Sequence, residues 1–345
     1  MKKLKYLAIF FVPLSVGISF TQNSYWTFLP LVVFFGLVPL VELFFKPDFY
    51  NLSESERLSA EKDPFFDWLL YLMVPIQICF LFWYISVILR TESTFEIIGR
   101  TQAMGFMCGV IGINVGHELG HRSKRFEQFL SEILLLTSLE NHFMPYHNRG
   151  HHLQVATPED PATARKKEVI YLFWLRSHFS SYFQAWKIEL NRMKITHKSA
   201  FGIGNKMVVY TFAQLSVCLI IYLIFGLKGL LYFLIVATLG ILLLETVNYI
   251  EHYGLLRKKR ENGTYERVRR IHSWNSNHIV GRVLLFELSR HSDHHYKPDR
   301  PYQILESHDE SPIMPTGYPG MMVLALIPPL FFIVMNKRVE KTLSQ

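Results

Sequence analysis

Residues 147–161 read HNRGHHLQVATPEDP and hold three histidines within six positions, His147, His151 and His152. If this stretch is helical, His147 and His151 lie four residues apart on one face, with His152 beside them. Two other stretches repeat the pattern, HELGH at 117–121 and HSDHH at 291–295. Imidazole binds iron, copper, zinc and nickel, and one catalytic zinc takes only about three protein ligands. The eight clustered histidines therefore predict a site for more than one metal ion.

The composition predicts that these clusters belong to an integral membrane protein rather than a soluble one. Of the 345 residues, 50% are hydrophobic, 15% are aromatic and 28 are Phe, and the mean hydropathy is +0.17. Six apolar runs are long enough to cross a bilayer as helices. They cover approximately residues 5–21, 26–45, 66–89, 95–116, 207–225 and 230–250. We expect an all-α integral membrane protein with six transmembrane helices, forming a single domain over residues 1–345.

The distribution of charge predicts the orientation of these spans. With the basic amino terminus in the cytoplasm, six spans place the connections 46–64, 116–206 and 251–345 inside, and the polar cytoplasmic portions are 122–206 and 251–345. All the histidine clusters then lie at the inner mouth, together with nearly all Lys and Arg of a chain whose net charge is +8. The outer turns carry little beyond Arg90 and Lys228. This agrees with the positive-inside rule, which played no part in choosing the histidines.

Several smaller features complete the expected organisation. Cys79, Cys108 and Cys218 lie in apolar runs without a CxxC pair, so we expect packing roles and neither a disulfide framework nor a thiolate metal site. Residues 46–64 predict a loop or a short surface helix. The apolar piece at about 318–335 contains two prolines and predicts an interfacial or buried helix. Glu42, a charge inside an apolar run, is expected either to reach the membrane surface or to support the site.

The first histidine pair leaves two kinds of chemistry open. His117, Glu118 and His121 satisfy the H-E-x-x-H signature of zinc proteases, in which the Glu is the general base. That interpretation gives the other two clusters no role. A histidine-rich non-haem di-iron centre uses all three clusters, because neutral imidazoles leave ferrous ions electron-rich and open to O2. Burial of such a centre would exclude water from the reactive oxidant.

The motifs resemble those of the integral-membrane alkane 1-monooxygenase family, which is related to the membrane fatty acid desaturases and hydroxylases. The resemblance covers much of residues 112–335. The matching stretches are HELGHR at 117–122, HNRGHHLQVATPEDPATAR at 147–165, NYIEHYGLLR at 248–257, HSWNSNHIVGRVLLFELSRHSDHH at 272–295 and PTGYPG at 315–320. One departure is Tyr146, which precedes His147 where the family usually has Glu.

The resemblance implies a function and its partners. It implies hydroxylation of the terminal methyl of medium-chain n-alkanes by O2 at two iron ions, in the bacterial inner (plasma) membrane with the active site toward the cytoplasm. Electrons would come from rubredoxin, reduced by an NAD(P)H-dependent rubredoxin reductase. The other expected partners are a hydrophobic substrate and membrane lipid, and no nucleic acid. A fatty-acyl desaturase or hydroxylase and an aromatic-methyl monooxygenase are the alternatives with related chemistry.

The resemblance also implies which residues form the centre. The iron ligands would be His117, His121, His147, His151, His152, His252, His291, His294 and His295. By spacing alone, His252 would be a structural residue at a helix end. It is included among the ligands because it lies in the HYG motif of the family. Carboxylates near the ligands are candidates to orient imidazole N–H groups. They are Glu118, Asp160, Glu251 and Asp293, while Glu159 fits an ordinary solvated charge equally well.

Basic residues on the predicted cytoplasmic side form a candidate docking surface for an acidic rubredoxin. They are Arg149, Arg165, Lys166, Lys167, Arg257, Lys258 and Lys259. Membrane topology alone explains the same charges equally well.

Overall fold

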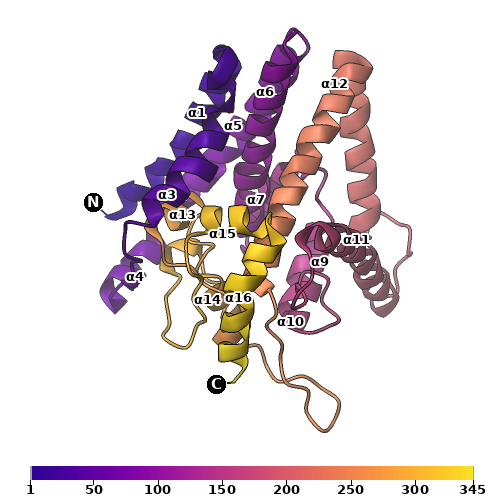
Figure 1. Cartoon of the computed structure of the whole chain (residues 1–345). Helices are drawn as coiled ribbons and strands as arrows, with labels where there is room; N and C mark the ends of the chain where they lie inside the picture. Colours follow the sequence, from indigo (N-terminus) through magenta and orange to yellow (C-terminus); the bar gives the residue numbers. More distant parts are fainter. Residues whose placement is uncertain (1, 345) are drawn as a thin grey trace. The chain divides into compact units, whose positions relative to one another are not determined.

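Helices are the regular secondary structure of the part that the computed structural model describes, residues 2–344 (Figure 1). Over those residues there is no β-strand, and only two isolated β-bridges occur, Lys259 with Tyr265 and Asn275 with Ile313. The predicted all-α class is confirmed. The chain divides into two compact units that alternate along the sequence. Unit 1 comprises Met1–Val33, Asp67–Asn148 and Ser181–Leu244, and unit 2 comprises Phe34–Phe66, Arg149–Ser180 and Glu245–Gln345.

Unit 1 contains the amino-terminal helices and the helices around the first histidine pair. They are η1 (Lys2–Phe10), α1 (Phe11–Thr21), η2 (Ser24–Phe28), α2 (Leu29–Leu31), most of α5 (Phe65–Ile88), α6 (Thr94–Met107), the π-helix η4 (Cys108–Ile113), α7 (Asn114–Gly120), α8 (Arg125–Leu136) and α9 (Phe143–Tyr146). Other elements continue from one unit into the other along the chain. They are the π-helices η3 (Val32–Leu37) and η5 (His147–His151), and the helices α11 (Ile170–Ile195) and α12 (Lys206–His252).

Unit 2 is built from shorter helices and long connections. They are α3 (Val38–Glu42), α4 (Glu54–Lys62), α10 (His152–Gln154), η6 (Arg270–His272), α13 (Ile279–Leu284), α14 (His291–Tyr296), η7 (Tyr302–Ile304), α15 (Tyr318–Ala325) and α16 (Pro328–Leu343). The short surface helix expected within 46–64 is α4, which begins with a capping box between Ser53 and Glu56. The apolar piece at 318–335 forms α15 and the first part of α16.

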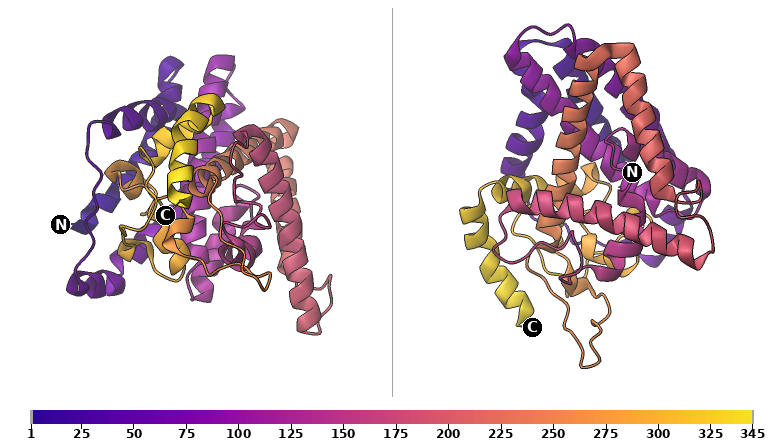
Figure 2. Two further views of the ribbon diagram at one scale, coloured as in Figure 1. Left: turned by 60° about the horizontal axis from the view of Figure 1, so that its bottom comes forward. Right: turned by 90° about the vertical axis from the view of Figure 1, so that its right-hand side faces the viewer.

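Four helices of the described part are long and apolar enough to span a membrane: Lys3–Thr21, Ser24–Glu42, Phe65–Ile88 and Lys206–His252. The last covers both predicted spans 207–225 and 230–250. Gly226, with φ 69° and ψ −174°, interrupts the helical backbone at the turn expected between them. The two arms of α12 meet there in the right-hand view of Figure 2. Predicted span 95–116 is helical but falls into the successive shorter elements α6, η4 and α7. The count of six spans therefore stays a prediction.

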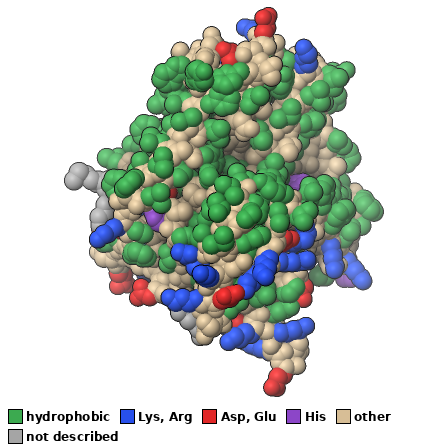
Figure 3. Space-filling view, viewed as in Figure 1, with side chains coloured by type: hydrophobic (Ala, Val, Ile, Leu, Met, Phe, Trp, Pro, Cys, Tyr) green, Lys and Arg blue, Asp and Glu red, His purple; other side chains and the backbone are tan. Residues whose placement is uncertain are grey.

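The surface of these helices is that of an integral membrane protein. On the first arm of α12, Phe212, Leu215 and Leu223 are 68%, 62% and 70% exposed. Side chains of this kind face lipid at no cost, whereas in water they would form an unfavourable apolar patch. In the face shown in Figure 3, hydrophobic side chains cover much of the surface, and most of the visible Lys and Arg lie in its lower half.

Glycines let the α6–η4 segment approach α12 closely within unit 1. A Cβ on Gly105 would lie 2.5 Å from the Cβ of Leu239, and a Cβ on Gly109 would overlap the side chain of Leu243. Small residues at such positions allow helix backbones to pack tightly in a membrane. This packing supports the segment that leads into α7 and its histidines.

Gly105→Ala should lower the midpoint temperature of thermal unfolding of the detergent-solubilised protein, because overpacking of this kind costs about 1–3 kcal/mol. Gly36→Ala is the matched control, since nothing lies within 4 Å of a Cβ there. We expect the control to unfold at the wild-type temperature or slightly above it. Equal midpoints for the two variants would contradict the close approach of α6 to α12.

Candidate metal centre

The first histidine group is built by α7 and by the start of η5, both in unit 1. His117 and His121 follow the i,i+4 spacing at the end of α7. The Asn148 side-chain amide donates to the carbonyl of Gly120 at 3.0 Å and ties the start of η5 to the end of α7. The ring of Phe143 stacks on that of His147 with centroids 4.4 Å apart. These contacts bring the imidazole of His147 beside the α7 pair.

The three imidazoles converge through their Nε2 atoms. His117 Nε2 lies 2.9 Å from His147 Nε2 and 3.0 Å from His121 Nε2, and the last two are 3.1 Å apart. Two donors bound at right angles to one transition-metal ion at about 2.1 Å are about 3 Å apart. A triangle of this size places three lone pairs around one point, which fits a single metal ion.

A second group lies entirely in unit 2 and joins three segments that are distant in sequence. His151 ends η5, His252 ends α12, and His291 and His295 lie on α14. The Nε2 of His291 is 3.1 Å from that of His252 and 2.9 Å from that of His295, which in turn is 3.2 Å from that of His151. Their exposed fractions are at most 4%. His147 and His151, expected on one helical face, thus belong to different groups.

The HYG motif ends α12 so that His252 can join this group. Gly254 adopts a φ of 71°, the left-handed conformation that commonly follows a helix and that glycine adopts without strain. The amide of Gly254 donates to the carbonyl of Ala164 at 2.8 Å, and the indole N–H of Trp274 donates to the carbonyl of Tyr253 at 2.9 Å. The spacing of histidines in the sequence pairs His252 with no other histidine. The contacts of Gly254 and Trp274 fix the end of α12, where His252 lies beside His291.

The remaining predicted ligands, His152 and His294, are also buried in unit 2. Their ring centroids are 5.0 Å apart, and the ring of His152 lies 4.5 Å from that of His295. Burial lowers the pKa of His294 to about 3 and holds the pKa of His295 well below its usual value. Both rings are therefore neutral at pH 7 and keep a lone pair for a metal ion. The donor set fits iron as well as other transition metals.

The carboxylates predicted to orient imidazoles have different partners. Asp160 fits that role, because its Oδ2 lies 2.9 Å from the Nδ1 of His151 and accepts from the Thr163 hydroxyl at 2.7 Å. Glu251 lies beside His291, with its Oε2 3.2 Å from Nε2. Glu118 instead forms an ion pair with Arg122 at 2.9 Å.

Asp293 holds together the chain that follows α14. Its carboxylate accepts from Arg300 at 2.7 Å and from the backbone amide of Glu306 at 3.0 Å, and it lies 3.0 Å from His308 Nε2. That amide and the guanidinium of Arg300 lower the pKa of Asp293 although burial raises it. The carboxylate stays charged and anchors the residues after the ligand helix.

Other charges near the motifs take structural partners. Glu42 neither reaches the surface nor meets a histidine: it is 2% exposed and accepts from the Gly281 amide at 2.9 Å. Glu159 is exposed and accepts from the Tyr265 hydroxyl, as a solvated charge does. His272 pairs with Glu266, and His278 pairs with Ser276.

A residue that the sequence reasoning did not single out is Tyr318, whose hydroxyl donates to Glu251 at 2.7 Å. Its only signal was its place in the PTGYPG stretch.

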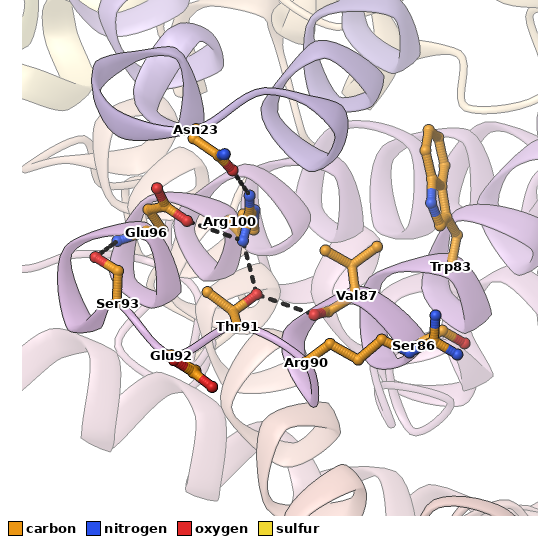
Figure 4. A pocket seen from close by; sticks show the side chains of 10 residues that line it. All are labelled: Asn23, Trp83, Ser86, Val87, Arg90, Thr91, Glu92, Ser93, Glu96 and Arg100. Carbon is orange, nitrogen blue, oxygen red and sulfur yellow. Dashed lines mark hydrogen bonds and ion pairs between the residues drawn. The ribbon is translucent and has the colours of Figure 1, made fainter.

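A pocket of about 550 Å³ opens at the other end of the α6–η4–α7 segment of unit 1 (Figure 4). Arg100 lies among its lining residues, about 20 residues before the α7 histidines, which is roughly 30 Å along a helix. The guanidinium is already engaged by Thr91, Asn23 and the Gln22 carbonyl at 2.7–3.0 Å. This pocket is therefore remote from the histidines of its own unit.

The protease interpretation of H-E-x-x-H gains no support from the geometry of unit 1. The group that joins His117 and His121 is a third imidazole. The glutamate that would act as general base is held in the Glu118–Arg122 pair, and Arg122 also lies 3.4 Å from Asp67. A general base needs a free carboxylate within reach of the metal-bound water.

Comparisons with known proteins agree with the metal-centre interpretation. Residues 97–325 match the model of the family described as fatty acid desaturase. The chain is 38% identical over 325 residues to alkane 1-monooxygenase 1 of Alcanivorax borkumensis, covering 93% of this chain and 80% of that protein. It is 38% identical over 330 residues to the alkane 1-monooxygenase of Pseudomonas putida, covering 94% and 81%. It is 27% identical over 353 residues to the xylene/toluene monooxygenase hydroxylase component of Pseudomonas putida, covering 98% and 89%. The chain therefore belongs to the alkane 1-monooxygenase family, within the wider fatty acid desaturase family, and is a membrane oxidoreductase of the monooxygenase type.

Proposed function

We propose that the protein hydroxylates the terminal methyl of medium-chain n-alkanes to 1-alkanols at a non-haem di-iron centre, with the whole chain acting as one monooxygenase. The observation that carries this proposal is the pair of converging imidazole groups, in a chain whose relatives are alkane 1-monooxygenases. The reaction consumes one O2, two electrons and two protons, and gives one alkanol and one water. Bound iron supplies the activation of O2.

The residues of the chain hold and shape this centre. The nine histidines are the proposed iron ligands: His117, His121, His147, His151, His152, His252, His291, His294 and His295. Asp160 fixes the ring of His151 by accepting from Nδ1, which points Nε2 at the metal. The stacked ring of Phe143 gives the first group an apolar wall. Burial of eight of these rings keeps bulk water away from the reacting atoms, while His121 is half-buried.

Electrons would arrive from reduced rubredoxin at the cytoplasmic face of the bacterial inner membrane. Basic residues of unit 2 support this partner, since Lys258 and Lys259 are exposed and neighbour the ligand-bearing end of α12. An acidic redox protein would be steered to such a surface by long-range attraction.

The product of the reaction tests the substrate class. Purified protein in lipid nanodiscs, supplied with rubredoxin, its reductase and NADH, should convert n-alkanes of medium length to 1-alkanols under air. Gas chromatography with mass spectrometry identifies the products, and chain lengths from short to long define the preferred range. An olefin product from a fatty-acyl substrate would instead indicate a desaturase. Oxidation of p-xylene but of no n-alkane would indicate an aromatic-methyl monooxygenase.

Loss of one imidazole should remove iron and turnover together. His151→Ala should lower the iron content from about two per chain and abolish alkane hydroxylation, because the second group then loses a donor. Iron and zinc are quantified together by plasma mass spectrometry. His197→Asn is the control, since His197 is exposed and its φ of 53° suits Asn. Full iron and full turnover in His151→Ala would contradict the ligand assignment, and wild-type protein with zinc and little iron would contradict the oxygenase.

Charge reversal on the basic surface tests the redox partner. Lys258→Glu with Lys259→Glu should slow electron transfer from rubredoxin by roughly ten-fold at low salt, and the difference from wild type should shrink as ionic strength rises. Stopped-flow oxidation of reduced rubredoxin measures the rate. Lys228→Glu is the matched control, because Lys228 lies near the Gly226 turn of α12, which is predicted to be on the outer side of the membrane and away from the basic surface. Rates that do not depend on salt in any variant would contradict docking through charge.

A further inference from the structure

The last helix of unit 2, α16, has one side whose packing is fixed. Phe331, Met335 and Val339 recur every four residues along the helix and are 0% exposed. This row packs at the HYG motif that ends α12. The ring of Tyr253 lies 4.8 Å, between centroids, from that of Phe331, and its hydroxyl donates to the Asn336 side chain at 2.8 Å. The opposite side of α16 therefore faces outward.

The outward side of α16 changes from apolar to basic along its length. Leu330 and Ile333 are 48% and 66% exposed, and Lys337, Arg338 and Lys341 are exposed as well. At 3.6 residues per turn, Leu330, Ile333, Lys337 and Lys341 lie within about 80° of one another around the helix axis, and Arg338 lies next to them. These five residues form what we call the α16 stripe, with an apolar half followed by a cationic half.

The positive charge of the α16 stripe is not neutralised by the residues around it. Glu340 is the one acidic residue in the sequence of α16, and it pairs with the ammonium group of Lys166 at 2.7 Å. Among residues 2–344, no carboxylate forms an ion pair with Lys337, Arg338 or Lys341. The cationic half of the stripe is therefore available to an anion from outside the chain.

The order of the two halves matches the boundary between the acyl chains and the headgroups of a bilayer. Leu330 and Lys341 are about 16 Å apart along the helix axis, so the stripe is long enough to extend from the hydrocarbon region into the headgroup region. A helix that carries an apolar surface beside Lys and Arg is typical of the membrane interface. An acidic protein could cover the cationic half, but it would leave Leu330 and Ile333 in water. A phospholipid covers both halves.

We infer that the α16 stripe binds anionic phospholipid, with the acyl chains against its apolar half and the phosphate-bearing headgroup against its cationic half. This binding site goes beyond the proposed hydroxylation and does not depend on the metal ions. It lies on the helix that packs at the HYG motif, so the bound lipid holds the element that supports the end of α12.

The test titrates full-length protein in detergent micelles with phosphatidylglycerol, or with phosphatidylcholine of the same acyl chains, and counts bound lipids by native mass spectrometry. Wild type should bind phosphatidylglycerol more tightly than phosphatidylcholine. Lys337→Gln with Lys341→Gln should weaken phosphatidylglycerol binding by roughly five-fold per lysine and leave phosphatidylcholine binding unchanged. Both side chains are exposed, so this variant should fold as wild type does. Lys258→Gln with Lys259→Gln is the matched control, because it removes the same charge from exposed positions outside α16.

The apolar half of the stripe has a variant of its own. Ile333→Asn should weaken the binding of both lipids, because it removes apolar contact with the acyl chains. Equal phosphatidylglycerol binding by wild type and the Lys337 and Lys341 variant would overturn the inference. Equal losses in that variant and in the matched control would also overturn it, since net charge would then decide. Unchanged lipid binding with slower oxidation of reduced rubredoxin would assign these cations to the redox partner and overturn it as well.

Discussion

The convergence of imidazole nitrogens is the constraint on which the rest of each unit depends. In both groups the Nε2 atoms stand about 3 Å apart, so several lone pairs point at one place. Neutral rings repel one another weakly at this distance, but charged rings would repel strongly. Burial keeps the ring of His294 neutral by lowering its pKa, and a bound metal ion would convert an unfavourable cluster into a set of bonds.

Helix ends supply the precision that this convergence needs. His117 and His121 end α7, His252 ends α12, and His291 opens α14. Each end is fixed by contacts that are distant in sequence, such as the Asn148 amide on the carbonyl of Gly120. Residues on rigid elements hold a site more exactly than residues on loops. The apolar helices of each unit thus provide the frame, and their ends provide the ligands.

Carboxylates near the histidines show how one residue type serves several purposes. Asp160 orients an imidazole, Glu118 pairs with Arg122, and Asp293 anchors the chain that follows α14. All three are close to histidines in sequence, yet their partners differ: Asp160 lies against the proposed ligand His151, and the other two pair with arginines. The position of a carboxylate in a motif places it near the ligands along the chain, but it does not determine which group the carboxylate binds.

The sequence by itself determined the membrane class, the all-α fold and most of the apolar helices, and its histidine spacing predicted a metal site. It could do so because helical periodicity, hydropathy and i,i+4 spacing are local properties. Only the tertiary structure decided that His147 and His151 join different groups, that His252 meets His291, and that Tyr318 fixes Glu251. These pairings join segments up to 144 residues apart, and no local pattern encodes them. They exist because packing of buried helices fixes distances that the spacing of residues along the chain cannot.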